Sequence, residues 1–338
     1  MTTNISNNQL NIRSELIIKN GYLVYEEYFN GWTQDDLSLL HSATKGITSV
    51  LAGIGIDKNY FSLNDKVLDF FPNRNFTNVD DRKKSITIEN LLQMQSGIKW
   101  DQAVDPEPMK NSNDSIKFVL DRPMNYDPGT FYRYSAGDPQ LLSAIITRVT
   151  NKSLLEFTED NLFSKIGIGK DSTPSYKWDA SPDGITIGTG NLYLIFKDFA
   201  KFGFLCLNNG SWDNMQVVSS DWISYSTWNK SNWQDLVDYK TDDYSFYWWI
   251  RKNLSFNYNA WGANGQYLTI FPDYDMIIVF TANDDTTATL NYHFDLIENF
   301  IVPAIYEIKT TTSSTGFSEN FIIVLSIVAL VIISNKRK

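Results

Sequence analysis

The chain has 338 residues and a formal net charge of −10, from 29 lysines and arginines against 39 aspartates and glutamates. Hydrophobic residues make up 43% and charged residues 20% of the chain, which excludes disorder for most of it, and the acidic balance argues against nucleic acid as a partner. A single cysteine, Cys206, excludes an intrachain disulfide, and with only two histidines, His41 and His293, we expect no metal and no cofactor.

The first two thirds of the chain predict a β-hairpin followed by helices. Two β-rich runs, 16–19 and 23–29, flank Asn20-Gly21, which is a typical hairpin turn. Beyond them apolar residues recur at the three- and four-residue spacing of helices, with Thr87 as the expected cap of one helix and Gly97 as its stop. The helices expected here cover residues 42–58, 67–71, 87–95, 139–150, 154–166 and 198–207.

In the last third of the chain the pattern changes to strands. Short β runs cover residues 245–251, 267–271 and 276–281, residues 272–275 form a turn, and residues 290–308 return to a helical pattern. Because strands lie at both ends and helices lie between them, we expect an α+β fold. In this α/β sandwich an antiparallel sheet is built from both termini and a helical region is inserted.

The C-terminal segment predicts a membrane anchor. A Ser/Thr run, 310–315, precedes an apolar stretch, 321–333, that only Ser326 interrupts, and residues 336–338 are all basic. A helix that is apolar all round suits a bilayer better than one side of a folded body. We expect a single-pass transmembrane helix with its basic end in the cytoplasm and the body extracytoplasmic. A helix packed on the body is one alternative; a cytoplasmic body is another, since residues 1–13 show no signal peptide.

Ser42 and Lys45 form the candidate catalytic pair. In the segment Ser42-Ala43-Thr44-Lys45 both side chains fall on one face of a helix, because residues i and i+3 are neighbours there. A buried lysine loses its proton easily, and the neutral amine is then a base. At a helix start, the Ser42 hydroxyl also lies near the positive end of the helix dipole. The alternative interpretation of Ser42 is an ordinary helix cap.

Other serine arrangements are weaker. Ser96-Gly97-Ile98-Lys99 repeats the Ser-x-x-Lys spacing, but Gly97 stops a helix there, so we interpret Ser96 as structural. His41 adjoins Ser42, and neighbours on a helix point apart. The chain also has no G-x-S-x-G elbow, so a Ser-His-Asp triad is not expected.

Four segments follow one another in the order of a known family. They are LLHSATKGITS (39–49), ITIENLLQMQSGI (86–98), DPGTFYRYS (127–135) and GANGQ (262–266). The chain resembles the β-lactamase-related serine hydrolases, the group of class C β-lactamases, D-alanyl-D-alanine peptidases, family VIII esterases and 6-aminohexanoate-dimer hydrolases. The four segments resemble, in order, its nucleophile segment, a second family block, the block with the catalytic tyrosine and the K-T-G or H-T-G strand. The resemblance implies a β-lactamase/transpeptidase-like fold.

The resemblance also implies a role for each matching residue. Ser42 would be the acylated nucleophile, Lys45 would deprotonate it, and Tyr134 would act with Lys45 as base and then as acid toward the leaving group. Because a phenol titrates near 10, Tyr134 needs a neighbouring cation, which Lys45 would supply. The oxyanion hole would be the backbone N–H groups of Ser42 and Gln266, with Gly265 allowing close approach to the substrate.

The chain departs from the family at two positions. The family's Y-x-N is Tyr134-Ser135-Ala136 here, and its K/H-T-G is Ala263-Asn264-Gly265. An asparagine and a cation that meet β-lactams are therefore missing, while the nucleophile, base and oxyanion hole remain. We expect substrate contacts from Ala263, Asn264, Gly265 and Trp261. The aromatic residues considered for a pocket wall, for each of which core packing is the simpler interpretation, are Trp100, Trp178, Trp248, Trp249, Tyr258 and Trp261.

The expected function is therefore that of a serine hydrolase of esterase or amidase type, acting through an acyl-enzyme on a small-molecule ester or amide. The alternatives are a β-lactamase or D-Ala-D-Ala carboxypeptidase, and a catalytically inactive surface-binding module. The oligomeric state stays open. The expected domains are a polar segment (1–13), the hydrolase domain (14–309), a Ser/Thr linker (310–318) and a transmembrane anchor with a basic tail (319–338).

Overall fold

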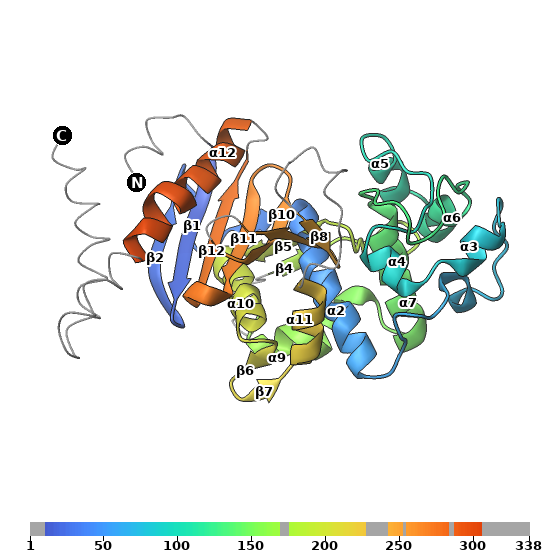
Figure 1. The fold of residues 1–338 in the computed structure, drawn as a ribbon, viewed down its shortest axis with the longest axis horizontal. Helices are drawn as coiled ribbons and strands as arrows, with labels where there is room; N and C mark the ends of the chain where they lie inside the picture. The colour runs from blue at the N-terminus through green and yellow to red at the C-terminus, as the bar shows by residue number, and fades with distance from the viewer. Residues whose placement is uncertain (1–10, 170–175, 228–242, 253–254, 284–286, 306–338) are drawn as a thin grey trace.

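A seven-stranded sheet forms the body of the computed structural model of the protein (Figure 1). The structure describes residues 11–169, 176–227, 243–252, 255–283 and 287–305, and in the last range the side chains from residue 292 on. The strand order is β2-β1-β12-β11-β10-β9-β8, and every pairing is antiparallel. The strands are β1 (Ile12–Lys19), β2 (Tyr22–Tyr28), β8 (Asp243–Ser245), β9 (Trp248–Arg251), β10 (Asn257–Gly262), β11 (Gln266–Phe271) and β12 (Met276–Ala282).

The two ends of the described chain meet inside this sheet. β1 pairs with β12 from Ile12 opposite Ala282 to Lys19 opposite Met276. Every residue of β12 is buried, as is usual for a central strand covered on both faces. The expected α+β arrangement, with a sheet built from both termini, is therefore observed.

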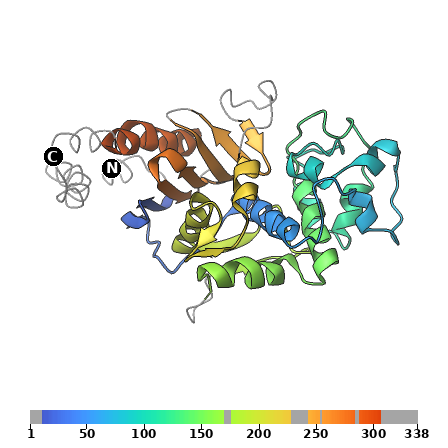
Figure 2. The same cartoon turned by 60° about the horizontal axis from the view of Figure 1, so that its bottom comes forward.

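Helices cover the sheet on both faces (Figures 1 and 2). On one face α10 (Phe196–Leu207) contacts β1, β11 and β12, and α2 (Thr44–Asp57) contacts β10. On the other face α12 (Thr287–Leu296) continues into the π-helical turn η5 (Ile297–Ile301). The apolar side chains of this second layer come from β1, β11, β12 and η5, and include Ile17, Phe271, Met276, Ile278, Ile297 and Ile301.

A helical region stands beside α2, at the end of the sheet where β8 and β9 lie (Figure 1). Its helices are short except for α7, which packs against α2. The elements are η2 (Val67–Phe70), α3 (Asp81–Ser85), α4 (Ile88–Leu92), α5 (Pro106–Lys110), α6 (Ser115–Leu120) and α7 (Gly137–Thr150).

Shorter elements connect the two layers. A second sheet has three strands in the order β3-β5-β4, and its strand β3 directly precedes the turn that contains Ser42. The remaining elements are β3 (Leu37–Leu39), η1 (His41–Ala43), α8 (Leu154–Thr158), η3 (Glu159–Phe163), α9 (Ser164–Ile166), β4 (Tyr176–Trp178), β5 (Leu192–Ile195), β6 (Ser211–Trp212), β7 (Met215–Gln216), α11 (Ser220–Thr227) and η4 (Pro272–Tyr274).

Local chemistry explains where the predicted elements hold and where they differ. Thr87 caps α4 as predicted, in a capping box in which Thr87 and Asn90 exchange side-chain hydrogen bonds with each other's backbone N–H. The run 245–251, predicted as one strand, is instead a hairpin of β8 and β9 that turns at Phe246 and Tyr247, both with positive φ. Bulky aromatic residues rarely adopt that conformation, so the sequence carries no turn signal there.

The predicted transmembrane helix at 319–338 requires a correction. A bilayer core of about 30 Å needs roughly 20 apolar residues in a helix, whereas α2 and α7 have 14 residues each. No helix in the described part of the chain is long and apolar enough to cross a membrane. The segment 319–338, the linker 310–318 and residues 1–10 lie outside the described residues. The membrane anchor and the extracytoplasmic location based on it are therefore without structural support.

The contact between α2 and α11 yields a stability prediction. A Cβ atom on Gly53 would lie 2.3 Å from Cδ1 of Trp222, whose indole N–H donates to the Ser49 carbonyl at 3.1 Å and cannot move freely. Alanine gains about 1 kcal/mol in helix propensity, but overpacking of this kind costs about 1–3 kcal/mol net. Gly53→Ala should therefore lower the free energy of unfolding by that amount in urea titrations.

Two further variants test the cause. Gly190→Ala, whose added Cβ would have only ordinary contacts from 3.5 Å outward, should leave the stability nearly unchanged. Combining Gly53→Ala with Trp222→Phe should cost less than the sum of the single losses, because the smaller ring relieves the clash. If the losses in the free energy of unfolding of the two single variants simply add in the double variant, contact with Trp222 is not the cause of the loss in Gly53→Ala.

Candidate active site

Ser42 lies in the 3₁₀ turn η1, between β3 and α2. His41 enters this turn with a φ of 48°, in the left-handed region, and Leu40 donates its backbone N–H to the Leu192 carbonyl of β5 at 2.9 Å. A Cβ on Gly262 of β10 would lie 2.2 Å from the Leu40 carbonyl oxygen. Only glycine allows β10 to pass so close, and this approach fixes the Ser42 turn against the large sheet.

Lys45 is on the first turn of α2 and is 1% exposed. Its Nζ donates to Ser42 Oγ at 2.8 Å and to the Thr189 carbonyl at 2.9 Å. Burial holds the pKa of Lys45 well below its ordinary value, and the positive charge of Lys110 acts in the same direction. The structure therefore places an amine that favours its neutral form within hydrogen-bond reach of the serine hydroxyl.

Tyr134 reaches the same point from the helical region, just before α7. Its hydroxyl shares a hydrogen bond with Ser42, and the centroid of its ring lies 5.0 Å from Lys45 Nζ. Burial raises the pKa of Tyr134 to about 12, against the opposing effect of the Ser42 hydrogen bond. The three residues predicted to be catalytic thus converge. Burial thus acts in opposite directions on the pKa values of the two groups, raising that of the Tyr134 phenol and lowering that of the Lys45 amine.

The segment 263–265 forms a loop and not the strand that the family resemblance implied. Gly262 pairs with Gln266 across the β10–β11 hairpin, and Asn264 and Gly265 turn the chain with φ values of 60° and 80°. Asn-Gly is the dipeptide that best tolerates such angles. The Asn264 amide lies 3.1 Å from His41 Nε2, so this loop is tied to the turn that carries Ser42.

Gln266, predicted for the oxyanion hole, is fully buried at the start of β11. Its side-chain amide donates to the Asn264 carbonyl at 2.9 Å and to the Ala282 carbonyl at 2.6 Å. Both β10 and β11 contact η1. The side chain is thus used to hold the hairpin loop, and the backbone of Gln266 lies at the strand end nearest to Ser42.

Trp261 lies away from the cavity beside Ser42, although it was predicted to contact substrate. Its ring packs against those of Trp249, Tyr267 and Phe294, on the sheet face that α12 covers. Trp249 in turn stacks on Tyr134, with 5.9 Å between the ring centroids. Trp249 was one of the aromatic residues considered for a pocket wall, and it contacts a candidate catalytic residue. The members that are buried in the core are Trp100, Trp178, Trp248 and Tyr258.

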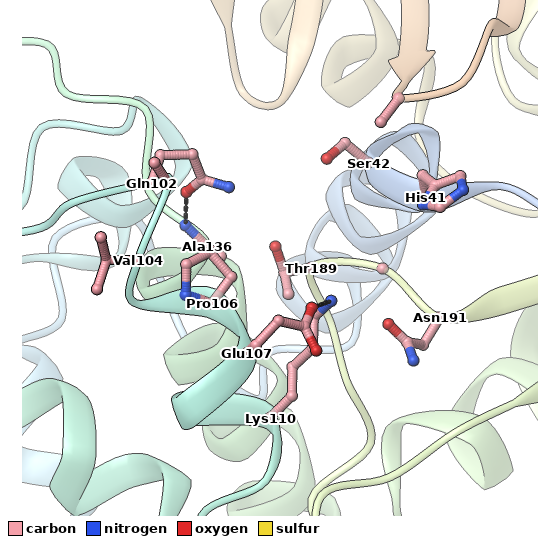
Figure 3. A pocket seen from close by; sticks show the side chains of 13 residues that line it. His41, Ser42, Gln102, Val104, Pro106, Glu107, Lys110, Ala136, Thr189 and Asn191 are labelled. Atoms are coloured by element: carbon pink, nitrogen blue, oxygen red, sulfur yellow. Dashed lines mark hydrogen bonds and ion pairs between the residues drawn. The ribbon is translucent and has the colours of Figure 1, made fainter. Parts of the chain in front are cut away.

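A cavity of about 320 Å³ opens beside Ser42 (Figure 3). Ala263 lines it, as predicted for a substrate contact, and His41 stands beside Ser42 on the same wall. The wall opposite them comes from the helical region, of which the sequence analysis connected Tyr134 and Ala136 with the site but not residues 102–110. The described residues of that wall are Gln102, Ala103, Val104, Pro106, Glu107, Lys110 and Ala136.

One feature of the sequence indicates a helix in this wall. Asp105-Pro106 is a typical helix start, with proline at the first helical position, and Glu107 and Lys110 then share a helix face. The helix α5 that begins there has only five residues, so no hydrophobic period could indicate it. Within the described residues, no group of three or more His, Cys, Asp or Glu side chains could hold a metal ion.

Ser96 has the structural position that the sequence indicated. It is buried, and its hydroxyl donates to Asp138 Oδ1 at 2.8 Å. Burial raises the pKa of Asp138 to about 7, although hydrogen bonds from Ser96 and Ser135 oppose the shift. Asp138 is on the first turn of α7, four residues after Tyr134, and therefore helps to fix the segment that presents the tyrosine.

Residues 14–299 match the Beta-lactamase family, and the chain belongs to this family of serine hydrolases, which includes esterases and amidases. This confirms the resemblance inferred from the four segments. The match covers the sheet, the helical region and the site between them.

Individual relatives agree with this assignment. The chain is 22% identical over 301 residues to the 6-aminohexanoate-dimer hydrolase of Paenarthrobacter ureafaciens, covering 82% of this chain and 74% of that one. A structure assigned as a 6-aminohexanoate-dimer hydrolase from Bacillus anthracis superposes with a TM-score of 0.74 at 21% identity, over 91% of this chain and 82% of that one. A family VIII carboxylesterase gives a TM-score of 0.67 at 18% identity, over 85% and 90%. At these identities the structural similarity establishes the fold.

Asp138 provides a pH-dependent stability prediction. Its pKa is about 7 in the folded protein and about 4 in the unfolded chain. Between pH 4 and pH 7 the Asp138 carboxyl is ionised in the unfolded chain but still protonated in the folded protein. The stability that the neutral carboxyl contributes at low pH is therefore lost as the pH rises through 7. Asp138→Asn should remove this loss and stabilise the protein by about 2–4 kcal/mol at pH 8. This range follows from a pKa difference of roughly 3 between the two states, at about 1.36 kcal/mol per pKa unit.

Urea titrations at pH 5 and pH 8 measure this effect. The control is Asp81→Asn, because Asp81 is almost fully exposed on α3 and its replacement should change both titrations little. If Asp138→Asn shows the same pH dependence of stability as the parent, folding does not raise the pKa of Asp138.

Proposed function

We propose that the protein hydrolyses an ester or amide bond through an acyl-enzyme on Ser42. The observation that carries this proposal is the 2.8 Å hydrogen bond between Ser42 Oγ and the buried amine of Lys45. A serine hydroxyl is a weak nucleophile unless a base within hydrogen-bond reach accepts its proton. Lys45 lies within that reach, and its desolvation lowers the pKa of the amine and so favours the form that can accept a proton.

The proposed acylation involves all three residues. Ser42 Oγ attacks the carbonyl carbon of the substrate while Lys45 Nζ accepts the hydroxyl proton. The tetrahedral intermediate then collapses, the bond to the leaving group breaks, and Tyr134 donates its proton to the departing oxygen or nitrogen. Tyr134 regains a proton from Lys45, which restores both groups. With a pKa of about 12, Tyr134 is protonated at the moment the leaving group requires it.

Deacylation reverses the proton transfers with water in place of the leaving group. The oxyanion of both intermediates would be stabilised by the backbone N–H groups of Ser42 and Gln266. The contacts of η1 with β10 and β11, and the clearance that Gly262 provides, support this assignment. Asn264 and Gly265 would then act by shaping the loop, and Ala263 by lining the cavity.

The cavity favours a simple ester or amide over a β-lactam. Ala263 and Ala136 line it where the family resemblance places a cation and an asparagine. The relatives include proteins named as a 6-aminohexanoate-dimer hydrolase and as a family VIII carboxylesterase. A β-lactamase or D-Ala-D-Ala carboxypeptidase is the alternative, and rapid nitrocefin turnover would select it. A catalytically inactive binding module is the second alternative.

A fluorophosphonate probe tests the nucleophile. The probe should label the protein at Ser42, and Ser42→Ala should abolish the labelling, which mass spectrometry of tryptic peptides can establish. Ser96→Ala is the matched control, because Ser96 belongs to the other Ser-x-x-Lys segment and donates to Asp138. Labelling that survives Ser42→Ala would refute the proposal, and an inert but folded parent would select the inactive module.

Kinetics with p-nitrophenyl esters test the base and the acid. Lys45→Ala and Tyr134→Phe should each lower kcat about 10²–10⁴-fold, as is usual for groups that transfer protons in the transition state. The control for the tyrosine is Tyr132→Phe, since the buried Tyr132 hydroxyl makes no hydrogen bond with the described residues. Equal effects at positions 132 and 134 would contradict the role of Tyr134.

The pH profile should follow from the same groups. Activity should rise with pH as Lys45 loses its proton, with a midpoint well below the ordinary lysine value, and Tyr134 should cause no alkaline loss below about pH 12. A midpoint near 10.5 would mean that Lys45 is not the base.

A further inference from the structure

The ion pair of Glu107 and Lys110 lies where the cavity beside Ser42 meets a second groove. Both residues line the first cavity, of about 320 Å³, and also the neighbouring groove, of about 380 Å³. Asn191 lines both spaces from the opposite side. Figure 3 shows Glu107 and Lys110 below Thr189, across the cavity from His41 and Ser42. A substrate whose carbonyl lies at Ser42 and whose chain extends toward the groove therefore meets this pair.

The two partners differ in how they face the solvent. Lys110 Nζ and Glu107 Oε1 are 2.8 Å apart, but the lysine side chain is 21% exposed and that of Glu107 is 75% exposed. The ammonium is thus held against the cavity wall, whereas the carboxylate covers it from outside. An ion pair with one exposed partner exchanges readily, because its net free energy is small. A carboxylate of a ligand could replace Glu107 on Lys110 while Glu107 turns into water.

The backbone that carries Lys110 is firmly fixed. Asp105, before the first turn of α5, accepts from Arg122 at 2.7 Å and from the backbone N–H of Asp101 at 2.7 Å. Met109 is completely buried beside it. At the other end, the Asn111 amide donates to the Glu107 carbonyl at 2.8 Å. A charge on such a rigid support recognises a ligand at a low entropic cost.

Among the described residues that line the cavity, Lys110 is the one lysine or arginine, and His41 is the other residue that can carry a positive charge. Lys45 favours its neutral form, and Ala263 stands at the position where the family resemblance places a cation. Lys110 approaches instead from the helical region. Its positive charge reaches the site, since it contributes to the lowered pKa of Lys45.

We infer that Lys110 determines specificity by binding an anionic group of the substrate, so that the preferred substrates are esters or amides that carry a carboxylate on the chain next to the scissile bond. This inference rests on the proposed function, because it takes Ser42 as the point of attack. Lys110 acts in binding, and Glu107 occupies its ammonium until the substrate replaces it.

Two esters with one leaving group test the inference: p-nitrophenyl butyrate, which is neutral, and mono-p-nitrophenyl glutarate, which ends in a carboxylate. Both are assayed on the alkaline plateau of the pH profile, where Lys45 is neutral in every variant. Lys110→Met should lower kcat/KM for the glutarate ester about 10–100-fold, mainly through KM, as expected for the loss of a hydrogen-bonded charge pair. For the butyrate ester the change should stay within about threefold.

Three further variants sharpen the result. Lys110→Arg should retain the preference for the glutarate ester, and Glu107→Gln should raise kcat/KM for it several-fold, because the competing carboxylate is gone. Lys84→Met is the matched control: Lys84 pairs with Asp81 at 3.0 Å with the same i,i+3 spacing but lies outside the cavity. Equal losses with both esters in Lys110→Met, or no loss with either, would overturn the inference.

Binding to Ser42→Ala separates this inference from the proposed function. That variant should bind the glutarate ester more tightly than the butyrate ester in calorimetry, and adding Lys110→Met should abolish the difference. If wild-type protein hydrolyses neither ester but this difference is present, the acyl-enzyme proposal fails and the anion site stands. If wild-type protein hydrolyses both esters and no difference is present, the anion site is refuted and the proposed function stands.

Discussion

The burial of Lys45 is the constraint on which the rest of the site depends. An ammonium taken out of water without a counter-charge is destabilised, which lowers the pKa of the group. The structure provides no carboxylate for it among the described contacts of Nζ, only Ser42 Oγ and the Thr189 carbonyl. The neighbouring Gly46 keeps water out, because a Cβ there would be 3.1 Å from Ala260 and 3.2 Å from Trp248. Close packing of α2 on the sheet thus provides the basicity.

Buried polar groups then fix the helical region that supplies the opposite wall. Lys83 is fully buried and its Nζ donates to the Leu120 and Arg122 carbonyls, each at 2.6 Å, which satisfies the C-terminal end of α6. Asp138, at the start of α7, accepts a hydrogen bond from the Ser96 hydroxyl. Such groups are costly to bury unless every partner is in place, so they select one arrangement of short helices that have little hydrophobic surface of their own.

The sequence predicted those parts that depend on local patterns. The hairpin of β1 and β2, the cap at Thr87 and the Ser42–Lys45 spacing each follow from neighbours within a few residues. β10 was not predicted, because its run NYNAWG lacks a clear alternation of polar and apolar residues, and its position depends on the clearance at Gly262. The side of the sheet on which Trp261 packs, against Tyr267 and Phe294, could not be predicted for the same reason. Which face of a strand meets the site is decided by a register that no local pattern records.

The proposed catalytic residues and the proposed anion site lie on different parts of the chain. Ser42 and Lys45 are fixed by the sheet, whose close contacts at Gly46 and Gly262 tolerate no change in backbone position. Lys110 is on α5, which packs on α6 and is anchored through Asp105. A substitution on α5 can therefore change the charge at the cavity while the geometry around Lys45 stays the same. Under the proposed function, this separation would let the chain lack the family's cation at Ala263, retain the serine, lysine and tyrosine, and still offer a positive charge to a substrate.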